Sequence, residues 1–165
     1  QQVTQTFHRI PNDKDITVVS KVNSMYTGGG NGMLVDGIVG NEYWKGGEWQ
    51  GYFDTNFEAV VDLRQSTPVH FVGLHLLQDV SPWIVYPKEV RFEYSIDGQH
   101  FQPLITVQNK VPPEAKGPEV QTLGAKVAVT ARYIKVVAVN GGALPAWHES
   151  AGKPTYLFLD EVIVK

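Results

Sequence analysis

The sequence predicts an all-β fold, an antiparallel β-sandwich of about eight strands. Short apolar runs alternate with polar residues at a period of two, the pattern of strands with one face in a core and the other in water. Glycine (16 residues) and proline (10 residues) are frequent, as many short strands joined by turns require. No stretch shows a convincing helical period. The length of 165 residues suits one domain with a single core.

The clearest strand covers residues 90–96, where four apolar residues alternate with polar ones: Val90, Phe92, Tyr94 and Ile96. We expect all four side chains to point into the core. The dipeptide Asp97-Gly98 follows and accepts the positive φ angles of a tight turn. The pattern therefore predicts a hairpin that leads into a short strand at residues 103–107.

The other strands follow from the same reading. They are expected at residues 16–22, 57–63, 71–77 and 155–164, with a pair of strands within 126–139. A turn is expected at residues 65–68, and a long loop rich in glycine, carboxylate and tryptophan is expected at residues 36–52. Prolines and glycines in residues 108–124 exclude regular structure and predict a long surface loop. The glycine-rich residues 26–32 predict a turn, because neither a Gly-Lys-Ser/Thr ending nor a helix follows, as phosphate-binding loops need.

The start of the chain differs from the rest. Residues 1–15 are polar and without period, which predicts a lead-in or linker from a preceding domain, and residues 16–165 form the expected sandwich. The chain begins at Gln1 without a methionine, so we expect a piece of a longer protein. No apolar run approaches the roughly 20 residues of a spanning helix, and no signal peptide is visible.

The net charge and the absence of cysteine limit the classes of partner and of chemical site that the chain can have. The formal net charge of -3 gives no basic field for phosphate backbones or anionic bilayers, so we expect neither nucleic acid as a partner nor membrane insertion. Cysteine is absent, which removes disulfides and thiolate sites. Without disulfides or an Asn-x-Ser/Thr acceptor, the chain is more typical of an exported bacterial protein than of a secreted animal domain.

Several short motifs occur in an order and spacing typical of one family. They are Leu34-Val35-Asp36-Gly37, Val60-Val61-Asp62-Leu63, the 93–98 hairpin, Ala131-Arg132-Tyr133-Ile134-Lys135-Val136 and Asp160-Glu161-Val162. From about residue 36 to the end, the chain resembles the discoidin domain, also called the coagulation factor V/VIII C-type domain. The segments 78–83 and 147–161 look like C-terminal modules of bacterial chitobiases or β-hexosaminidases.

The resemblance carries several implications. Such modules are similar to family 32 carbohydrate-binding modules, which implies a galactose-binding-domain-like jelly roll, frequently a structural calcium, and a sugar site on loops at one end. It also implies a secreted, periplasmic or cell-surface location in a bacterium, and a catalytic domain in the same chain. For calcium, the resemblance points to the carboxylates of Asp36 and Glu161, with backbone carbonyls of Val39 and Asn41 completing the oxygen shell. In the alternative, Asp36 caps a turn and Glu161 is solvated.

Aromatic residues in the long loops are candidates for sugar binding. A pyranose presents an apolar C–H face that stacks on an aromatic ring and a hydroxyl rim that needs donors and acceptors. The candidates are Trp83, Trp147 and Trp44 as platforms, with His148, Asn41 and Glu42 at the rim. Trp83 and Trp147 are equally compatible with core positions, and Trp49 with a plug in the mouth of the sandwich. Galactose-type and N-acetylhexosamine-type sugars both remain open.

Nothing in the sequence predicts catalysis by the domain itself. A glycosidase needs two carboxyls about 5 to 10 Å apart, and adjacent Asp160 and Glu161 on a strand are expected to point to opposite faces. No zinc-type histidine spacing and no Gly-x-Ser-x-Gly elbow occurs, and His70 and His75 are expected to be structural. We therefore expect a non-catalytic glycan-targeting module of a glycoside hydrolase. The alternatives are a docking module that binds no sugar, and adhesion to membranes or proteins.

Overall fold

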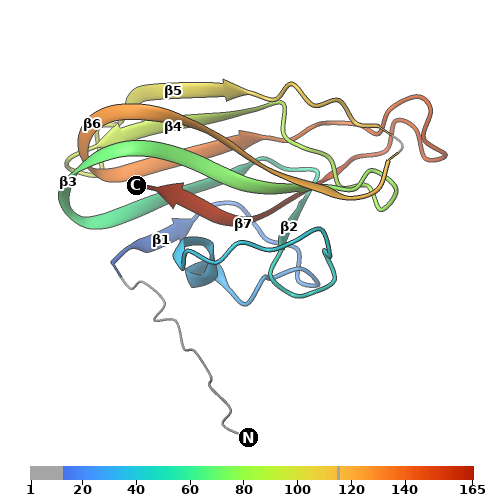
Figure 1. Cartoon of the computed structure of the whole chain (residues 1–165), viewed down its shortest axis with the longest axis horizontal. Helices are drawn as coiled ribbons and strands as arrows, with labels where there is room; N and C mark the ends of the chain where they lie inside the picture. Colours follow the sequence, from blue (N-terminus) through green and yellow to red (C-terminus); the bar gives the residue numbers. More distant parts are fainter. Residues whose placement is uncertain (1–12, 115) are drawn as a thin grey trace, which may run out of the picture.

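The computed structural model describes residues 13–114 and 116–165 and shows an almost entirely β architecture (Figure 1). The elements are β1 (Asp15–Val18), the 3₁₀ helix η1 (Asn31–Val35), β2 (Gln50–Phe53), β3 (Phe57–Gln78), β4 (Glu89–Ser95), β5 (Gln102–Gln108), β6 (Glu119–Val139) and β7 (Tyr156–Val164). All strand pairs are antiparallel, which confirms the predicted fold class. Most of the predicted lead-in, residues 1–12, lies outside the described residues. In the described part, no helix has the length and apolarity of a membrane span.

Two long strands build both layers of the sandwich. The hydrogen-bonded order is β2-β7-β3-β6-β4-β5, and β1 pairs with the first half of β3. In one layer Val61 of β3 lies opposite Ile134 of β6, and in the other Leu74 lies opposite Leu123. One sheet therefore folds over on itself, as the curved course of β3 and β6 shows (Figure 1).

The fold-over replaces a predicted turn. Residues 65–68 were expected to separate two strands, but β3 continues through them with a register shift between Asp62 and Thr67. Arg64 has a φ of 64°, and the backbone bends sharply there although the strand continues on both sides. The expectation of two separate strands is wrong for this reason, and the described residues form seven strands.

Two expected loops also contain strand. Residues 108–124 were expected to be irregular, but β6 begins at Glu119, directly opposite Gln78. The prolines restrict only the loop that ends at Pro118, because later residues keep their backbone N–H for pairing. Within the expected loop at 36–52, β2 pairs with the closing strand β7.

The hairpin prediction is confirmed with one correction. β4 and β5 pair across the turn, in which Gly98 has a φ of 74°. Ile96, expected in the core, is 57% exposed, whereas Ser95 is buried. The Ser95 hydroxyl accepts the backbone N–H groups of Asp97 and Gly98, so the turn chemistry overrides the alternation at this end of the strand.

The core lies between the two layers, and a second apolar cluster lies at the loop end. The main core includes Phe57, Leu74, Phe92, Val136 and Leu159. The second cluster joins Trp49 to Leu77, Ile84 and Phe158. Trp49 is only 2% exposed, so it is a plug and not a sugar platform. Its burial anchors the preceding loop on the outer side of β7.

Candidate functional site

Loops from four parts of the chain meet at one end of the sandwich, the right-hand end in Figure 1. One hollow of about 510 Å³ lies between the loops that carry Asp79 and Trp147, and another of about 470 Å³ lies between Asp79 and Trp44. The two hollows share Asp79 and Ser81 as a common wall. We call the combined surface, formed by residues 42–45, 79–82, 116–118 and 147–149, the loop-end groove.

Trp147 and His148 form one side of the groove. Trp147 is 51% exposed, and its ring lies 5.7 Å from that of His148, tilted by 52°. His148 is buried, and its Nδ1 accepts the backbone N–H of Ser150 at 3.0 Å. The short turn that places them is closed by the His148 backbone N–H, which donates to the Pro145 carbonyl. An exposed indole beside a fixed imidazole offers stacking and a hydrogen bond in one place.

Trp44 and Glu42 lie across the groove from them. Trp44 is half-buried, with edge contacts to Tyr26 and Phe158 at 6.0 and 6.2 Å between ring centroids. The ammonium of Lys45 lies 4.9 Å from the Trp44 ring centroid, so the ring already holds a cation. Glu42 lines the same hollow and is exposed. Trp44 is thus a wall of the groove more than an open platform.

Trp83 and Asn41 lie beside the groove and do not line either hollow. Trp83 packs against Val80, Val85 and Leu144, in a turn where its own φ is 73°. Its carbonyl accepts the backbone N–H of Tyr156 at 2.8 Å. The Asn41 side chain accepts the backbone N–H of Tyr43 at 2.8 Å. Both residues shape the loops that carry the groove.

Asp79, which sequence reasoning did not select, occupies the centre of the groove. It follows the last residue of β3, and its backbone exchanges two hydrogen bonds of 3.0 Å with Ile84. Partial burial raises the pKa of its carboxyl, against the effect of hydrogen bonds from the Trp44 side chain and the Ser81 backbone. Its position at the end of a buried strand, before a Ser-Pro turn, was a usable signal.

The carboxylates of the closing strand do not point to opposite faces. The register of β3 and β7 shifts between His75 and Leu76, so Asp160 is an extra residue in the ladder. As a result the Gly37 backbone N–H donates to Glu161 Oε1 at 3.1 Å, and the Gly40 N–H donates to Asp160 Oδ2. Both carboxylates therefore face the loop at residues 36–41, and the prediction of opposite faces is wrong because the strand is bulged.

Asp36 and Glu161 fit a cation site. Both are buried, at 4% and 5% exposure, and one oxygen of each, Asp36 Oδ2 and Glu161 Oε2, has no hydrogen-bond partner. Burial and the nearby carboxylates of Asp36 and Asp160 raise the pKa of Glu161 to about 8, against the Gly37 hydrogen bond. The alternative in which Glu161 is solvated is wrong. Asp36 does cap its turn through Oδ1, which accepts the Ile38 N–H at 2.8 Å.

The rest of a cation shell would have to come from backbone oxygens and water. Among the described residues, no group of three or more His, Asp or Glu side chains is arranged to hold a metal. The candidate carbonyls of Val39 and Asn41 belong to the same loop, and the Asn41 carbonyl accepts the Trp49 indole N–H at 3.2 Å. Two carboxylate oxygens supplemented by carbonyls suit a hard cation such as calcium better than zinc.

A buried histidine supports this loop. His75 Nδ1 lies 2.6 Å from Asp160 Oδ1, and its ring stacks on Trp49 at 5.5 Å with 22° between the planes. The prediction that His75 is structural is confirmed. His75, Asp160 and Trp49 together tie the 36–41 loop to the strands beneath it.

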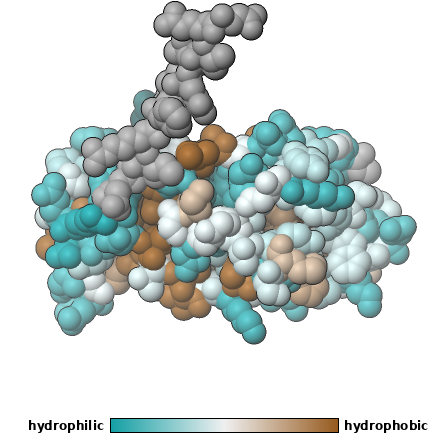
Figure 2. Space-filling view, turned by 90° about the horizontal axis from the view of Figure 1, so that it is seen from below, coloured by the Kyte–Doolittle hydropathy of each residue, from teal (hydrophilic) through white to brown (hydrophobic). Residues whose placement is uncertain are grey.

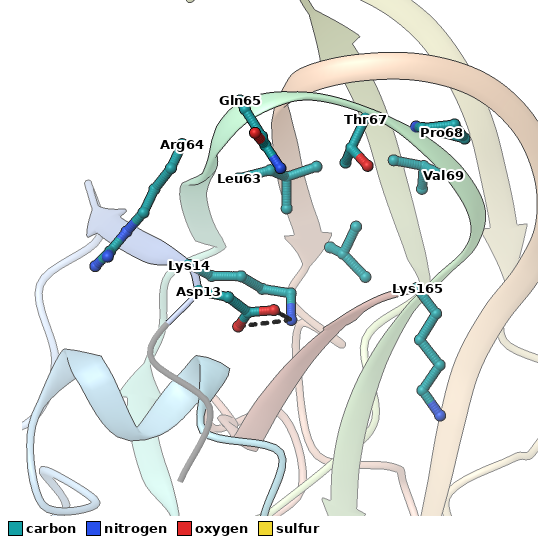
Figure 3. A pocket seen from close by; sticks show the side chains of 10 residues that line it. Asp13, Lys14, Leu63, Arg64, Gln65, Thr67, Pro68, Val69 and Lys165 are labelled. Atoms are coloured by element: carbon teal, nitrogen blue, oxygen red, sulfur yellow. Dashed lines mark hydrogen bonds and ion pairs between the residues drawn. The ribbon is translucent and has the colours of Figure 1, made fainter.

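Another hollow lies away from the loop end, at the bend of β3. Its volume is about 380 Å³, and Leu63 and Val69 contribute apolar side chains to its lining (Figure 3). Lys14 forms an ion pair of 3.4 Å with Asp13 on one side, and Lys165 lies on another. The face that carries β1 and η1 also shows apolar patches between hydrophilic ones (Figure 2).

Comparison with known proteins places the chain in a family. The model of the F5/8 type C domain matches residues 15–155. The chain belongs to this family. The resemblance noted in the sequence is thereby confirmed, and the F5/8 type C domains are non-catalytic modules. No curated protein gives a significant match to the chain.

Solved structures share the fold of this F5/8 type C domain. A family 32 carbohydrate-binding module of Clostridium perfringens NanJ, in complex with galactose, has a TM-score of 0.58 at 11% identity, covering 92% of this chain and 93% of that one. Another C. perfringens module, in complex with GalNAc-β-1,3-galactose, has a TM-score of 0.58 at 14% identity, covering 92% and 94%. A fragment described as a candidate chitobiase from Bacteroides thetaiotaomicron has a TM-score of 0.54 at 20% identity, covering 99% and 96%.

Proposed function

We propose that this F5/8 type C domain is a glycan-binding module of a secreted bacterial glycoside hydrolase of the chitobiase or β-hexosaminidase type. The observation that carries the proposal is the exposed ring of Trp147 beside His148 on the wall of the loop-end groove. An indole face takes the C–H face of a pyranose, and the imidazole and carboxylates take its hydroxyls. The galactose and GalNAc-galactose complexes of similar modules support this reading.

The groove is open, so the affinity for a monosaccharide should be weak. One stacking contact and a few hydrogen bonds must offset the entropy lost on association. We therefore expect dissociation constants on the order of micromolar to millimolar. Such weak binding is useful when the module is covalently attached to a catalytic domain. The module would raise the effective concentration of an attached catalytic domain at its glycan.

A glycan array followed by calorimetric titration tests the proposal. We expect the domain to bind one or more galactose- or N-acetylhexosamine-containing glycans, and Trp147→Ala to weaken that binding at least about tenfold. Ile96→Ala is the matched control, because Ile96 is 57% exposed and lies on the β4–β5 turn outside the groove. Absence of binding to every glycan by the unmodified domain would reject the function.

We also propose that Asp36 and Glu161 hold a structural calcium ion. The support is the pair of buried, unpartnered oxygens, which would be costly without a cation. The ion would fix the 36–41 loop against β7. We expect the melting temperature to rise on addition of calcium and to fall with a chelator in the unmodified domain, and Asp36→Asn to reduce this response. A melting temperature that does not change on addition of calcium or chelator would contradict the calcium proposal.

The alternative function, docking on a catalytic domain of the same chain, has its own supporting observation. The hollow in Figure 3 combines apolar residues with charged edges and lies at the bend, away from the groove. Under this alternative, Thr67→Arg in the hollow would weaken association with the catalytic domain, and Trp147→Ala would not. The two variants therefore separate targeting from docking.

A further inference from the structure

The loop-end groove carries an excess of negative charge. Asp79, Glu42 and Glu149 line it, and none of the three forms an ion pair among the described residues. The two ammonium groups of the groove are already engaged. Lys116 lies 3.0 Å from Glu119 and 3.7 Å from Glu114, and Lys45 lies over the Trp44 ring. The groove therefore carries three carboxylates that pair with neither of its two ammonium groups.

Asp79 is the most confined of these carboxylates. It forms the wall between the two hollows, and it is only partly exposed. Its carboxylate accepts hydrogen bonds from the Trp44 side chain and the Ser81 backbone, and partial loss of surrounding water raises its pKa. Among the described residues it forms no ion pair. A positively charged ligand group placed there would recover that lost solvation through a charge-assisted hydrogen bond.

His148 supplies a second, independent feature in the same hollow. The side chain is 7% exposed, and its Nδ1 accepts the Ser150 backbone N–H. In the neutral ring the proton therefore lies on Nε2, which has no partner among the described residues. His148 thus offers a buried, oriented donor to whatever enters the hollow that it lines.

We propose that the groove binds a cationic amino-sugar oligosaccharide, with a sugar ammonium at Asp79, a sugar oxygen at His148 Nε2–H and a ring face on Trp147. The inference rests on the proposed glycan-binding function and names its ligand class. Hollows on both sides of Asp79, of about 510 and 470 Å³, each fall within the size range of small-molecule sites. A ligand of at least two sugar units can therefore pass over the shared wall. A neutral or N-acetylated sugar would offer these carboxylates hydroxyl hydrogen bonds but no opposite charge.

Calorimetric titration with glucosamine oligomers, N-acetylglucosamine oligomers of equal length and galactose tests this inference. In mildly acidic buffer, where the sugar amine is protonated, we expect the free-amine oligomer to bind at least about tenfold more tightly than the acetylated one. Added salt should weaken only the amine complex. Asp79→Asn should abolish the preference, whereas Asp13→Asn, which removes the same charge outside the groove, should keep it.

The outcomes separate the two proposals. If neutral sugars bind as tightly as the amine oligomer, or if Asp79→Asn leaves the preference intact, the ligand class is wrong while glycan binding stands. If none of these sugars binds and no glycan on the array binds either, the proposed function fails together with the inference. Because the ligand comparison uses the unmodified domain, it gives a decision even if a variant folds poorly.

Discussion

At the scale of single residues, Trp147 and Trp83 differ in what surrounds them. Trp147 is half-exposed and its ring lies beside that of His148, whereas Trp83 packs on Val80, Val85 and Leu144. A ring that is exposed in the free domain gains its contacts on binding, but a packed ring already contributes to folding. Under the proposed function, the same residue type would serve recognition in one loop, whereas it serves stability in the other.

Substitution of the two tryptophans should separate these roles. We expect Trp83→Ala to lower the free energy of unfolding by about 2 kcal/mol, less than for a fully buried tryptophan, because it removes a half-buried ring. We expect Trp147→Ala to change that free energy by less than about 0.5 kcal/mol and to weaken glycan binding. Urea unfolding and titration measure both effects. Equal losses of stability would contradict the assignment.

Glu161 makes the stability of the metal-free domain depend on pH. Its pKa is about 8 in the folded state and near 4.5 in the unfolded chain, so the folded state binds one more proton between these values. Stability should then fall as pH rises from about 4.5 to about 8. Urea unfolding of the domain in chelator measures the slope, and Glu161→Gln should flatten it. A slope that is the same in the variant would refute this assignment.

At the scale of elements, the bulge in β7 connects the closing strand to the 36–41 loop. Asp160 and Glu161 each accept a backbone N–H from that loop, and Trp49 closes it from the other side. The sequence placed Asp36 and Glu161 together only through resemblance, because strand alternation alone puts neighbouring side chains on opposite faces. A bulge has no strong sequence signature when neither residue is glycine, so the meeting of both carboxylates with one loop could not be predicted.

Gly40 tests how tightly this loop is held. A Cβ at Gly40 would lie 3.0 Å from Asp160 Oδ2 and 3.1 Å from the Trp49 ring. We expect Gly40→Ala to lower the free energy of unfolding by about 1 to 3 kcal/mol, because neither neighbour can move freely. Gly32→Ala is the control, since nothing lies within 4 Å of its Cβ position. Thermal unfolding of both variants measures the difference in stability. A Gly40→Ala variant as stable as the unmodified domain would show that the loop is loosely held.

Strands were predicted best where one face of the strand is buried and the other is exposed to solvent. The 90–96 strand and its Asp97-Gly98 turn were predicted because the alternation is local and Gly98 marks the reversal. The bend of β3 was missed, since Arg64 adopts a positive φ that no local signal announces. Trp147 and His148 were selected as loop residues beside each other. Asp79 was not, because its role depends on loops that are distant in the sequence.

At the scale of the whole molecule, the sandwich separates two surfaces. The fold-over of β3 and β6 forms one end, with the hollow of Figure 3, and the loops gather at the other end around the groove. Because β3 runs through both layers, its bend and its C-terminal end lie toward opposite ends of the sandwich (Figure 1). Under the proposed function, a module built in this way would hold a glycan at one end and leave the other end free for contact with a neighbouring domain.

The most direct test of the account is the mapping of glycan binding by backbone amide chemical shifts in the unmodified, isotope-labelled domain. The titrants are the glycans found on the array and the glucosamine oligomers. We predict that the shifts concentrate at residues 42–45, 79–82 and 147–149, with the indole N–H of Trp147 among the largest. Shifts that concentrate instead around Leu63 and Val69, or none at saturating glycan, would contradict the claim that the loop-end groove is the binding site.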